Sequence, residues 1–326
     1  MATKQKKTTT IEKKLIGLAD IVIAAADRSK DPTFAIPIRA LSNVSFNERK
    51  GLIEMGSKKQ ARSFFNVGMA KKFMQTVLVA DALSELQRAD LTTSLREIYY
   101  RTKHTIADSH ENTFDTQDES DPVIEDLEVS LAALREELHV RAENSGSIVG
   151  PVVFGDDGDR VDCAKLGKGG YSVPSIVEPE YLEIRRCTAD FVLLVEKGTQ
   201  WNRLSEDKFW RRYNCVLLTG NGQPPRGVRR LARRLHEEHK LPVYVLVDND
   251  PWGYYIYSVI KQGSINLAFE SQRMAIPKAK FIGLSSADPE RYELPRNVGI
   301  KLNEKDIARA KELMNYQWFQ IGRAHV

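Results

Sequence analysis

The stretch Val243-Tyr-Val-Leu-Val-Asp-Asn-Asp250 decides the fold of the second half of this chain. Its first five residues form a near-continuous β-branched and aliphatic run, which is typical of a strand buried on both faces of a parallel sheet. Two runs of the same kind, Phe191–Val195 and Cys215–Leu218, precede it, and helix-like segments separate the three. Strands that alternate with helices in this way predict an α/β domain with a parallel sheet.

Acidic residues follow two of these predicted strands. Glu196 comes directly after the first strand, and Asp248 and Asp250 come at the end of the third. Because functional residues collect at the carboxyl ends of parallel strands, we expect the three side chains to lie close together. Carboxylates, with phosphate or water, suit Mg²⁺. A strand-end aspartate also commonly caps the next helix, but three carboxylates exceed what capping requires, so the sequence favours a magnesium site.

The segment after the second strand, Gly220–Gly227, opens a helix without matching a nucleotide-binding motif. Pro225 stands in place of the third glycine of GxGxxG, and Val228 and Arg229 replace the Lys and Ser/Thr of GxxxxGK[ST]. The helix that follows is predicted to have a basic face opposite an apolar face. Such a face suits either solvent or the phosphate backbone of DNA, and both interpretations stay open. Its four arginines are Arg229, Arg230, Arg233 and Arg234.

The first half of the chain is predicted to be mainly helical. The expected elements are an amphipathic helix over 15–26, small strands at 34–38 and 51–55, helices over 67–86 and 94–103, and, after an acidic loop at 115–121, a long helix with leucines at 127, 131, 134 and 138. A strand pair within Ser147–Phe154 would complete the order of a winged helix-turn-helix. Residues Gly155–Glu178, rich in Gly and Asp, indicate a linker or an extended wing.

The segment Leu95–Lys103 carries the most informative local pattern. Ser94 is predicted as the N-cap of its helix, with Glu97 completing a capping box. Helical spacing then places Arg96, Tyr100 and Lys103 on one face, away from the core. A tyrosine flanked by cations can attack or hold a phosphodiester, because arginine pairs with phosphate oxygens and positive charge favours the phenolate. From these residues alone, an ordinary surface tyrosine among helix charges is the alternative.

Composition limits the classes of protein that remain. The chain has 326 residues, with 42% hydrophobic and 28% charged, which excludes a disordered or fibrous protein and predicts roughly two domains. No apolar stretch approaches the roughly 18 to 20 residues of a membrane span, so no membrane is expected as partner. The net charge of +4 permits nucleic acid without requiring it. Three widely spaced cysteines exclude a disulfide scaffold and predict a reducing cytoplasm.

Six segments, in the same order along the chain, resemble the A-subunit family of archaeal topoisomerase VI, whose relative is the eukaryotic meiotic double-strand-break protein. They are RALSNVSFNERKGLI (39–53), MAKKFMQTVLVADAL (69–83), SLREIYY (94–100), VEKG (195–198), VLVDNDPWG (245–253) and MAIPKAKFIGL (274–284). The resemblance runs from about Asp31 to Phe319. It implies a type IIB DNA topoisomerase in which a CAP-like winged-helix domain carries the tyrosine and a Toprim domain binds Mg²⁺.

The resemblance also implies roles for particular residues. The second tyrosine of the IYY motif is the nucleophile of the family, here Tyr100, and Arg96 matches the arginine one turn earlier. The Toprim acidic set corresponds to Glu196, Asp248 and Asp250. The sequence GNGQPPRGVRRLARRL departs from the GxGYPD-like loop that relatives show, which leaves any DNA contact from that loop open.

Together these patterns predict five segments. They are an N-terminal tail, helix and small strands over 1–66, a winged-helix domain over 67–154, a linker or extended wing over 155–184, a Toprim domain over 185–319, and a non-native tail over 320–326. The tail, Gln320-Ile-Gly-Arg-Ala-His-Val326, reads as the translated adapter codons CAG-ATC-GGA-AGA-GCA-CAC-GTC, at a point where the family continues for several tens of residues. Codons for QIGRAHV followed by a genuine stop in the full locus would contradict this expectation.

The resemblance predicts the DNA-cleaving subunit of an ATP-dependent topoisomerase. Two copies would each break one strand of double-stranded DNA through a 5′-phosphotyrosyl link, and a separate GHKL-type ATPase subunit would bind ATP in an A2B2 complex, since this chain shows no nucleotide-binding fingerprint. We expect it in the cytoplasm, associated with the nucleoid. Two alternatives remain: a recombination-initiating endonuclease of the same family, and a non-catalytic DNA-binding protein with winged-helix and Toprim domains.

Overall fold

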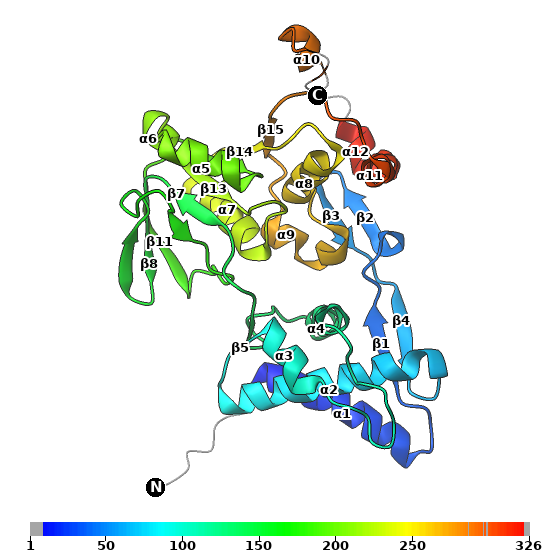
Figure 1. Cartoon of the computed structure of the whole chain (residues 1–326). Coiled ribbons are helices and arrows are strands. Elements are labelled where there is room, and N and C mark those ends of the chain that lie inside the picture. Colours follow the sequence, from blue (N-terminus) through cyan, green and yellow to red (C-terminus); the bar gives the residue numbers. More distant parts are fainter. Residues whose placement is uncertain (1–8, 286, 296, 298, 323–326) are drawn as a thin grey trace. The chain divides into compact units, whose positions relative to one another are not determined.

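The computed structural model describes residues 9–285, 287–295, 297 and 299–322. The chain divides into two compact units (Figure 1): unit 1 comprises Met1–Ile38 and Ser57–Glu143, and unit 2 comprises Arg39–Gly56 and Asn144–Val326. Most of the expected N-terminal tail and the last four residues of the expected non-native tail lie outside the described residues. Across the described part of the chain, no helix has the length and apolar character needed to cross a membrane.

Unit 1 is mainly helical. Its elements are α1 (Thr10–Asp27), β1 (Thr33–Pro37), β4 (Lys59–Ser63), α2 (Val67–Ala89), β5 (Thr93–Ser94), α3 (Leu95–Thr102), α4 (Gln117–Leu131) and β6 (Val140–Arg141). Strands β1 and β4 pair antiparallel, and β5 and β6 form a short parallel pair. Helix α2 packs against α1, α3 and α4, so the helices share one apolar core.

Helix α3 is held in that core by its apolar face. Ile98 is fully buried and Tyr99 is nearly so, and both belong to the cluster that includes Leu83 of α2 and Leu127 of α4. The predicted N-cap is confirmed, because the Ser94 hydroxyl accepts a hydrogen bond from the Glu97 backbone N–H at 3.1 Å. The helix that carries Tyr100 is therefore fixed at its start and along its buried side.

The structure differs from the expected acidic loop and long helix that follow. Helix α4 already begins at Gln117 and ends at Leu131, where Ala132 adopts a left-handed conformation with φ of 45°. The acidic residues 118 and 119 fall in the first turn, where negative charge is favoured by the positive end of the helix dipole. The prediction of a helix reaching Leu138 was wrong, although Leu138 is fully buried beyond the helix end.

Unit 2 contains the α/β domain. Its elements are η1 (Leu41–Asn43), β2 (Val44–Asn47), β3 (Leu52–Met55), β7 (Ser147–Val149), β8 (Val152–Asp156), β9 (Asp159–Asp162), β10 (Tyr171–Ser172), β11 (Leu182–Cys187), β12 (Phe191–Val195), α5 (Gly198–Glu206), α6 (Phe209–Arg212), β13 (Cys215–Thr219), α7 (Arg226–His239), β14 (Val243–Leu246), α8 (Pro251–Gln262), η2 (Ile265–Glu270), α9 (Ser271–Met274), β15 (Lys280–Ile282), α10 (Asp288–Arg291), α11 (Glu304–Asn315) and α12 (Gln317–Gly322).

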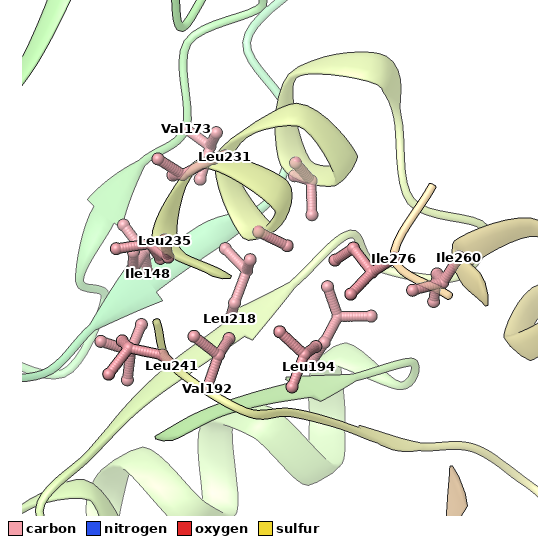
Figure 2. Packing of buried hydrophobic residues seen from close by; sticks show 14 of the residues in the cluster. Ile148, Val173, Val192, Leu194, Leu218, Leu231, Leu235, Leu241, Ile260 and Ile276 are labelled. Atoms are coloured by element: carbon pink, nitrogen blue, oxygen red, sulfur yellow. The ribbon is translucent and has the colours of Figure 1, made fainter. Parts of the chain in front are cut away.

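A six-stranded sheet in the order β10-β7-β13-β12-β14-β15 organises this unit. Strand β12 is parallel to β13 and to β14, and β14 is parallel to β15, which confirms the predicted parallel arrangement of the three apolar runs. Alternate residues of each strand point to opposite faces. Val192 and Leu194 pack with the residues of α7 and α8 on one face (Figure 2), whereas Leu193 and Val195 pack with the residues of α5 and α6 on the other.

The strands expected to form the wing lie in unit 2 instead. Strand β7 pairs antiparallel with β13 of the main sheet, and β8 pairs with β9 and β11 in a second, three-stranded sheet. Gly150 makes the change of sheet possible: its φ is 141°, and a Cβ there would lie 2.6 Å from the carbonyl oxygen of Cys215. The segment expected as a linker contributes β9, β10 and part of β11, and its buried Cys163 and Val173 join the core.

Candidate functional site

Helix α3 presents one of its two adjacent tyrosines to solvent. The side chain of Tyr100 is 55% exposed, whereas that of Tyr99 is 8% exposed. The guanidinium of Arg96, one turn earlier, lies over the Tyr100 ring at 5.8 Å from its centroid, and Arg96 Nη2 lies 3.4 Å from Tyr100 Oη. The structure therefore brings together the predicted nucleophile and its predicted arginine on a free face of the helix.

Lys103 was expected to share that face with Tyr100, but its ammonium group forms hydrogen bonds with other partners. Lys103 Nζ donates to Tyr99 Oη at 2.7 Å and to the backbone oxygen of Asp115 at 3.3 Å, and Tyr99 Oη in turn donates to the same oxygen at 2.9 Å. The hydrogen bond to Tyr99 raises the pKa of Lys103 above its ordinary value. Backbone and hydroxyl acceptors beside the helix thus draw Lys103 away from Tyr100.

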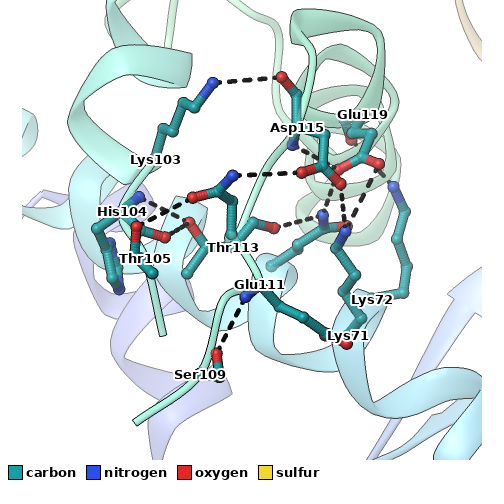
Figure 3. Close-up of polar contacts among 12 residues, drawn as sticks. Lys71, Lys72, Lys103, His104, Thr105, Ser109, Glu111, Thr113, Asp115 and Glu119 are labelled. Carbon is teal, nitrogen blue, oxygen red and sulfur yellow. Dashed lines mark hydrogen bonds and ion pairs between the residues drawn. The ribbon is translucent and has the colours of Figure 1, made fainter. Parts of the chain in front are cut away.

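A polar cluster anchors the chain that leaves α3 (Figure 3). The carboxylate of Asp115 pairs with Lys71 of α2 at 2.8 Å. Gln75, also on α2, donates to the Thr113 backbone oxygen at 2.7 Å and to the Glu119 carboxylate at 3.0 Å. These contacts tie the segment between α3 and α4 to α2.

The predicted carboxylates lie at the carboxyl ends of β12 and β14. These strands are neighbours, and Glu196 directly follows β12 while Asp248 lies two residues beyond β14. The backbone N–H of Asp248 donates to Glu196 Oε2 at 3.1 Å. Asp250 caps α8, because its Oδ1 accepts a hydrogen bond from the Gly253 N–H at 2.7 Å. The capping interpretation thus applies to Asp250, whereas a hydrogen bond links Glu196 and Asp248 between the ends of the two neighbouring strands.

Negative charge at this edge is only partly compensated. Burial raises the pKa of Glu196, and the charges of Asp248 and Asp250 add to that effect. The carboxylate of Asp248 has two polar side chains beside it, one from the residue before α5 and one from its first turn: Lys197 Nζ lies 3.3 Å from Oδ2 and Gln200 Nε2 lies 3.4 Å from Oδ1. A cation at this edge would relieve the repulsion among the three carboxylates.

The donor chemistry of this edge fits Mg²⁺, which takes oxygen ligands from one or two carboxylates and completes its shell with water or phosphate. The carboxylates are not gathered around a common point, however. Within the residues that the structure describes, no group of three or more His, Cys, Asp or Glu side chains has the spacing needed to hold a metal ion. The three carboxylates would have to come closer together to hold one ion.

Gly253 is a residue that the sequence interpretation did not single out. A Cβ at this position would lie 2.2 Å from the backbone oxygen of Asp248, because the first turn of α8 packs directly on the strand end. The order of Asp, Pro and Gly in DNDPWG was the available signal, since it places a cap, a first-turn proline and a close approach in sequence. Lys197 and Gln200 were also missed, because nothing in their spacing reveals a contact across the sheet.

We expect Gly253→Ala to destabilise unit 2 by about 2–4 kcal/mol, since the added methyl must displace backbone that holds Asp248. Gly169→Ala is the matched control, because a Cβ at Gly169 would meet no atom within 4 Å. Chemical denaturation followed by circular dichroism measures the difference. Equal midpoints for the two variants would show that the turn relaxes without cost.

The four arginines of α7 do not form the solvent-facing basic face that was expected. Arg229 and Arg234 are 5% and 2% exposed, and Arg234 donates to the backbone oxygens of Val177 and Leu182. Arg230 makes a bidentate pair with Glu178, with both N–O distances 2.9 Å. Arg233 pairs with Glu237 at 2.6 Å. Two kinds of acid thus pair with this face: Glu178, which is distant in the sequence, and Glu237 and Glu238, which lie one turn away on α7 itself. The one-dimensional pattern could not show the contact with Glu178, and no DNA contact is inferred from this face.

Family models match almost all of the chain beyond its first 70 residues. The model for the Toprim domain shared by Spo11 and the A subunit of topoisomerase 6 matches residues 191–325. The model described as "Type IIB DNA topoisomerase" matches residues 71–140, and "All-beta domain in DNA topoisomerase VI alpha subunit" matches residues 142–188. The first match extends into the terminal segment 320–326, whose non-native origin stays a prediction.

Curated relatives match over most of their length. The chain is 44% identical over 318 positions to a protein of Pyrococcus horikoshii that is named as the A subunit of type 2 DNA topoisomerase 6, with 94% of this chain and 82% of the relative covered. Proteins of the same name from Aeropyrum pernix and Methanocaldococcus jannaschii are 42% and 38% identical. The coverage is 93% of this chain and 81% of the relative for the first, and 95% and 83% for the second.

Proposed function

The chain belongs to the A-subunit family of type 2 DNA topoisomerase 6, as the DNA-cleaving subunit of a type IIB topoisomerase, and from this premise we propose how its residues divide the cleavage reaction. Tyr100 Oη attacks a phosphodiester of double-stranded DNA. The tyrosine O–H proton passes to water, a bond forms between Oη and phosphorus, and the bond from phosphorus to the 3′-oxygen breaks. The leaving 3′-oxygen takes a proton from water, so the products are a 5′-phosphotyrosyl link and a 3′-hydroxyl. Because bond energy is retained, the 3′-hydroxyl can reverse the step.

The observation that carries this assignment is the difference between the two adjacent tyrosines. Tyr100 is exposed and its hydroxyl has Arg96 beside it, whereas the Tyr99 hydroxyl is already engaged by Lys103 and Asp115. A nucleophile must reach the phosphorus, which a buried and hydrogen-bonded phenol cannot do without unfolding its surroundings. Arg96 is placed to hold a phosphate oxygen next to the attacking hydroxyl.

In this proposal Glu196, Asp248 and Asp250 hold Mg²⁺. When bound, Mg²⁺ neutralises charge on the scissile and adjacent phosphates and stabilises the leaving 3′-oxygen. The chain's own contribution is to keep Glu196 and Asp248 joined at the sheet edge and to fix Asp250 by its cap on α8. Asp250 therefore has one oxygen committed to the backbone and the other free for a ligand.

We further propose that α2, α3 and α4 form a CAP-like winged-helix domain that binds double-stranded DNA. Two copies of the chain would pair, and a GHKL-type ATPase subunit would complete an A2B2 complex in which ATP is bound by that partner. The word "subunit" in the relatives' names supports a partner of this kind. The complex would work in the cytoplasm on the nucleoid.

Relaxation of supercoiled plasmid tests the function as a whole. The purified chain, mixed with the ATPase subunit, Mg²⁺ and ATP, is expected to relax the plasmid and to leave protein covalently bound to 5′ ends when the reaction is stopped with detergent. Double-strand breaks without relaxation would favour the recombination-initiating endonuclease. Stoichiometric DNA binding without any covalent adduct would instead favour the non-catalytic DNA-binding protein.

Removal of one carboxylate should separate cleavage from binding. We expect Asp248→Ala to reduce Mg²⁺-dependent cleavage by at least about 100-fold, because the ion that stabilises the leaving oxygen is lost. DNA affinity, measured by fluorescence anisotropy in the absence of metal, should stay within a factor of about two, since unit 1 is unchanged. Undiminished cleavage by this variant would show that the acidic set is structural.

A further inference from the structure

We infer that Lys197 is a positioning residue that holds Asp248 until a divalent cation takes its place, so the ammonium and the metal compete for one carboxylate. This inference rests on the proposed role of Asp248 as a metal ligand. Lys197 directly follows Glu196 and precedes α5 in the chain, so the local backbone carries a metal ligand and its competitor side by side.

The contacts of Asp248 support a competition. Its Oδ2 lies 3.3 Å from Lys197 Nζ and its Oδ1 lies 3.4 Å from Gln200 Nε2, so both oxygens that a cation would use already face donors. Both distances are at the long end of hydrogen bonding, and the side chain of Lys197 is 58% exposed. An exposed ion pair of this kind is weak, so a divalent cation can displace the ammonium.

The Lys197–Asp248 pair reduces the repulsion among the three carboxylates at this edge of the sheet. Without a cation, Asp248 would face Glu196 and Asp250 with no positive charge on its carboxylate, and Lys197 relieves that repulsion. With a divalent cation present, the ammonium and the metal repel each other, and Lys197 must turn away from Asp248. The long, flexible lysine side chain allows this movement without any change in the backbone.

Divalent-cation titration of the full chain tests the competition without relying on cleavage. We expect Lys197→Ala to bind Mn²⁺ alone about 3- to 10-fold more tightly than the unaltered protein, measured by isothermal titration calorimetry, because one competing charge has been removed. Lys197→Arg should retain near-normal affinity. Lys168→Ala is the matched control: Lys168 forms a similarly exposed pair with Glu206, 3.4 Å away, at the other end of α5, so its loss should not change the affinity.

Amine labelling provides a second measurement on the unaltered protein. If Mn²⁺ releases Lys197 from Asp248, acetylation of Lys197 by a mild reagent, read peptide by peptide by mass spectrometry, should accelerate when Mn²⁺ is added, whereas Lys168 should not respond. One outcome would overturn the competition but not the metal assignment. In that outcome a folded Lys197→Ala protein binds Mn²⁺ with unchanged or weaker affinity, while Asp248→Ala no longer binds the ion. Equal Mn²⁺ binding by Asp248→Ala and the unaltered protein would overturn the metal assignment of the proposed function as well.

Discussion

Tyr100→Phe is expected to reduce the amount of covalent adduct with DNA by at least about three orders of magnitude, because the substitution removes the oxygen that bonds to phosphorus. The fold should be preserved, since the Tyr100 ring is exposed and its hydroxyl makes only a long contact of 3.4 Å with Arg96. Trapping with detergent, followed by detection of protein attached to 5′ ends, measures the loss.

Tyr99→Phe is the matched control for this prediction. It deletes the same atom from the neighbouring residue, but here the hydroxyl bridges Lys103 and the Asp115 backbone oxygen. We expect a loss of about 1–2 kcal/mol in the free energy of unfolding, because two hydrogen bonds are broken in a part-buried place, with the adduct still formed. An adduct mapped to Tyr99, or abolished equally by both substitutions, would contradict the assignment of the nucleophile.

The parallel sheet could be predicted because its central strands are buried on both faces. A run such as Phe191–Val195 must be apolar at every position when helices cover both sides, and few other structures require that pattern. The strands β7 and β8 could not be assigned in the same way. Whether Ile148 pairs within a hairpin or with β13 depends on which distant strand has a free edge, and that information is absent from the local sequence.

The candidate site was predictable where one element supplies all of its residues. Arg96 and Tyr100 are one turn apart on α3, so the helical period alone places them together. Contacts between elements were not predictable: Lys103 donates to the backbone oxygen of Asp115, and Arg230 of α7 pairs with Glu178, 52 residues away. Long, flexible side chains can reach several partners, so their contacts cannot be predicted from the sequence alone.

The two halves of the proposed site belong to different units, since Tyr100 lies in unit 1 and the carboxylates lie in unit 2. We propose that Tyr100 of one protomer meets the acidic set of its partner. In that arrangement, a heterodimer of Tyr100→Phe and Asp248→Ala chains contains one site with both defects and one site with none. We therefore expect such heterodimers, isolated through two different affinity tags, to nick one strand of a plasmid, whereas each parent homodimer neither nicks nor cuts it.

The alternative arrangement makes the opposite prediction from the same molecules. If each protomer completed its own site, every site in the heterodimer would lack either the tyrosine hydroxyl or Asp248, and no strand would be broken. Heterodimers that are folded and bind DNA but leave supercoiled plasmid intact would thus show that the site is formed within one chain. The nick should also carry protein derived only from the Asp248→Ala chain, because that chain alone retains Tyr100. Mass spectrometry of the attached protein therefore reports which protomer supplied the nucleophile, independently of the amount of cleavage.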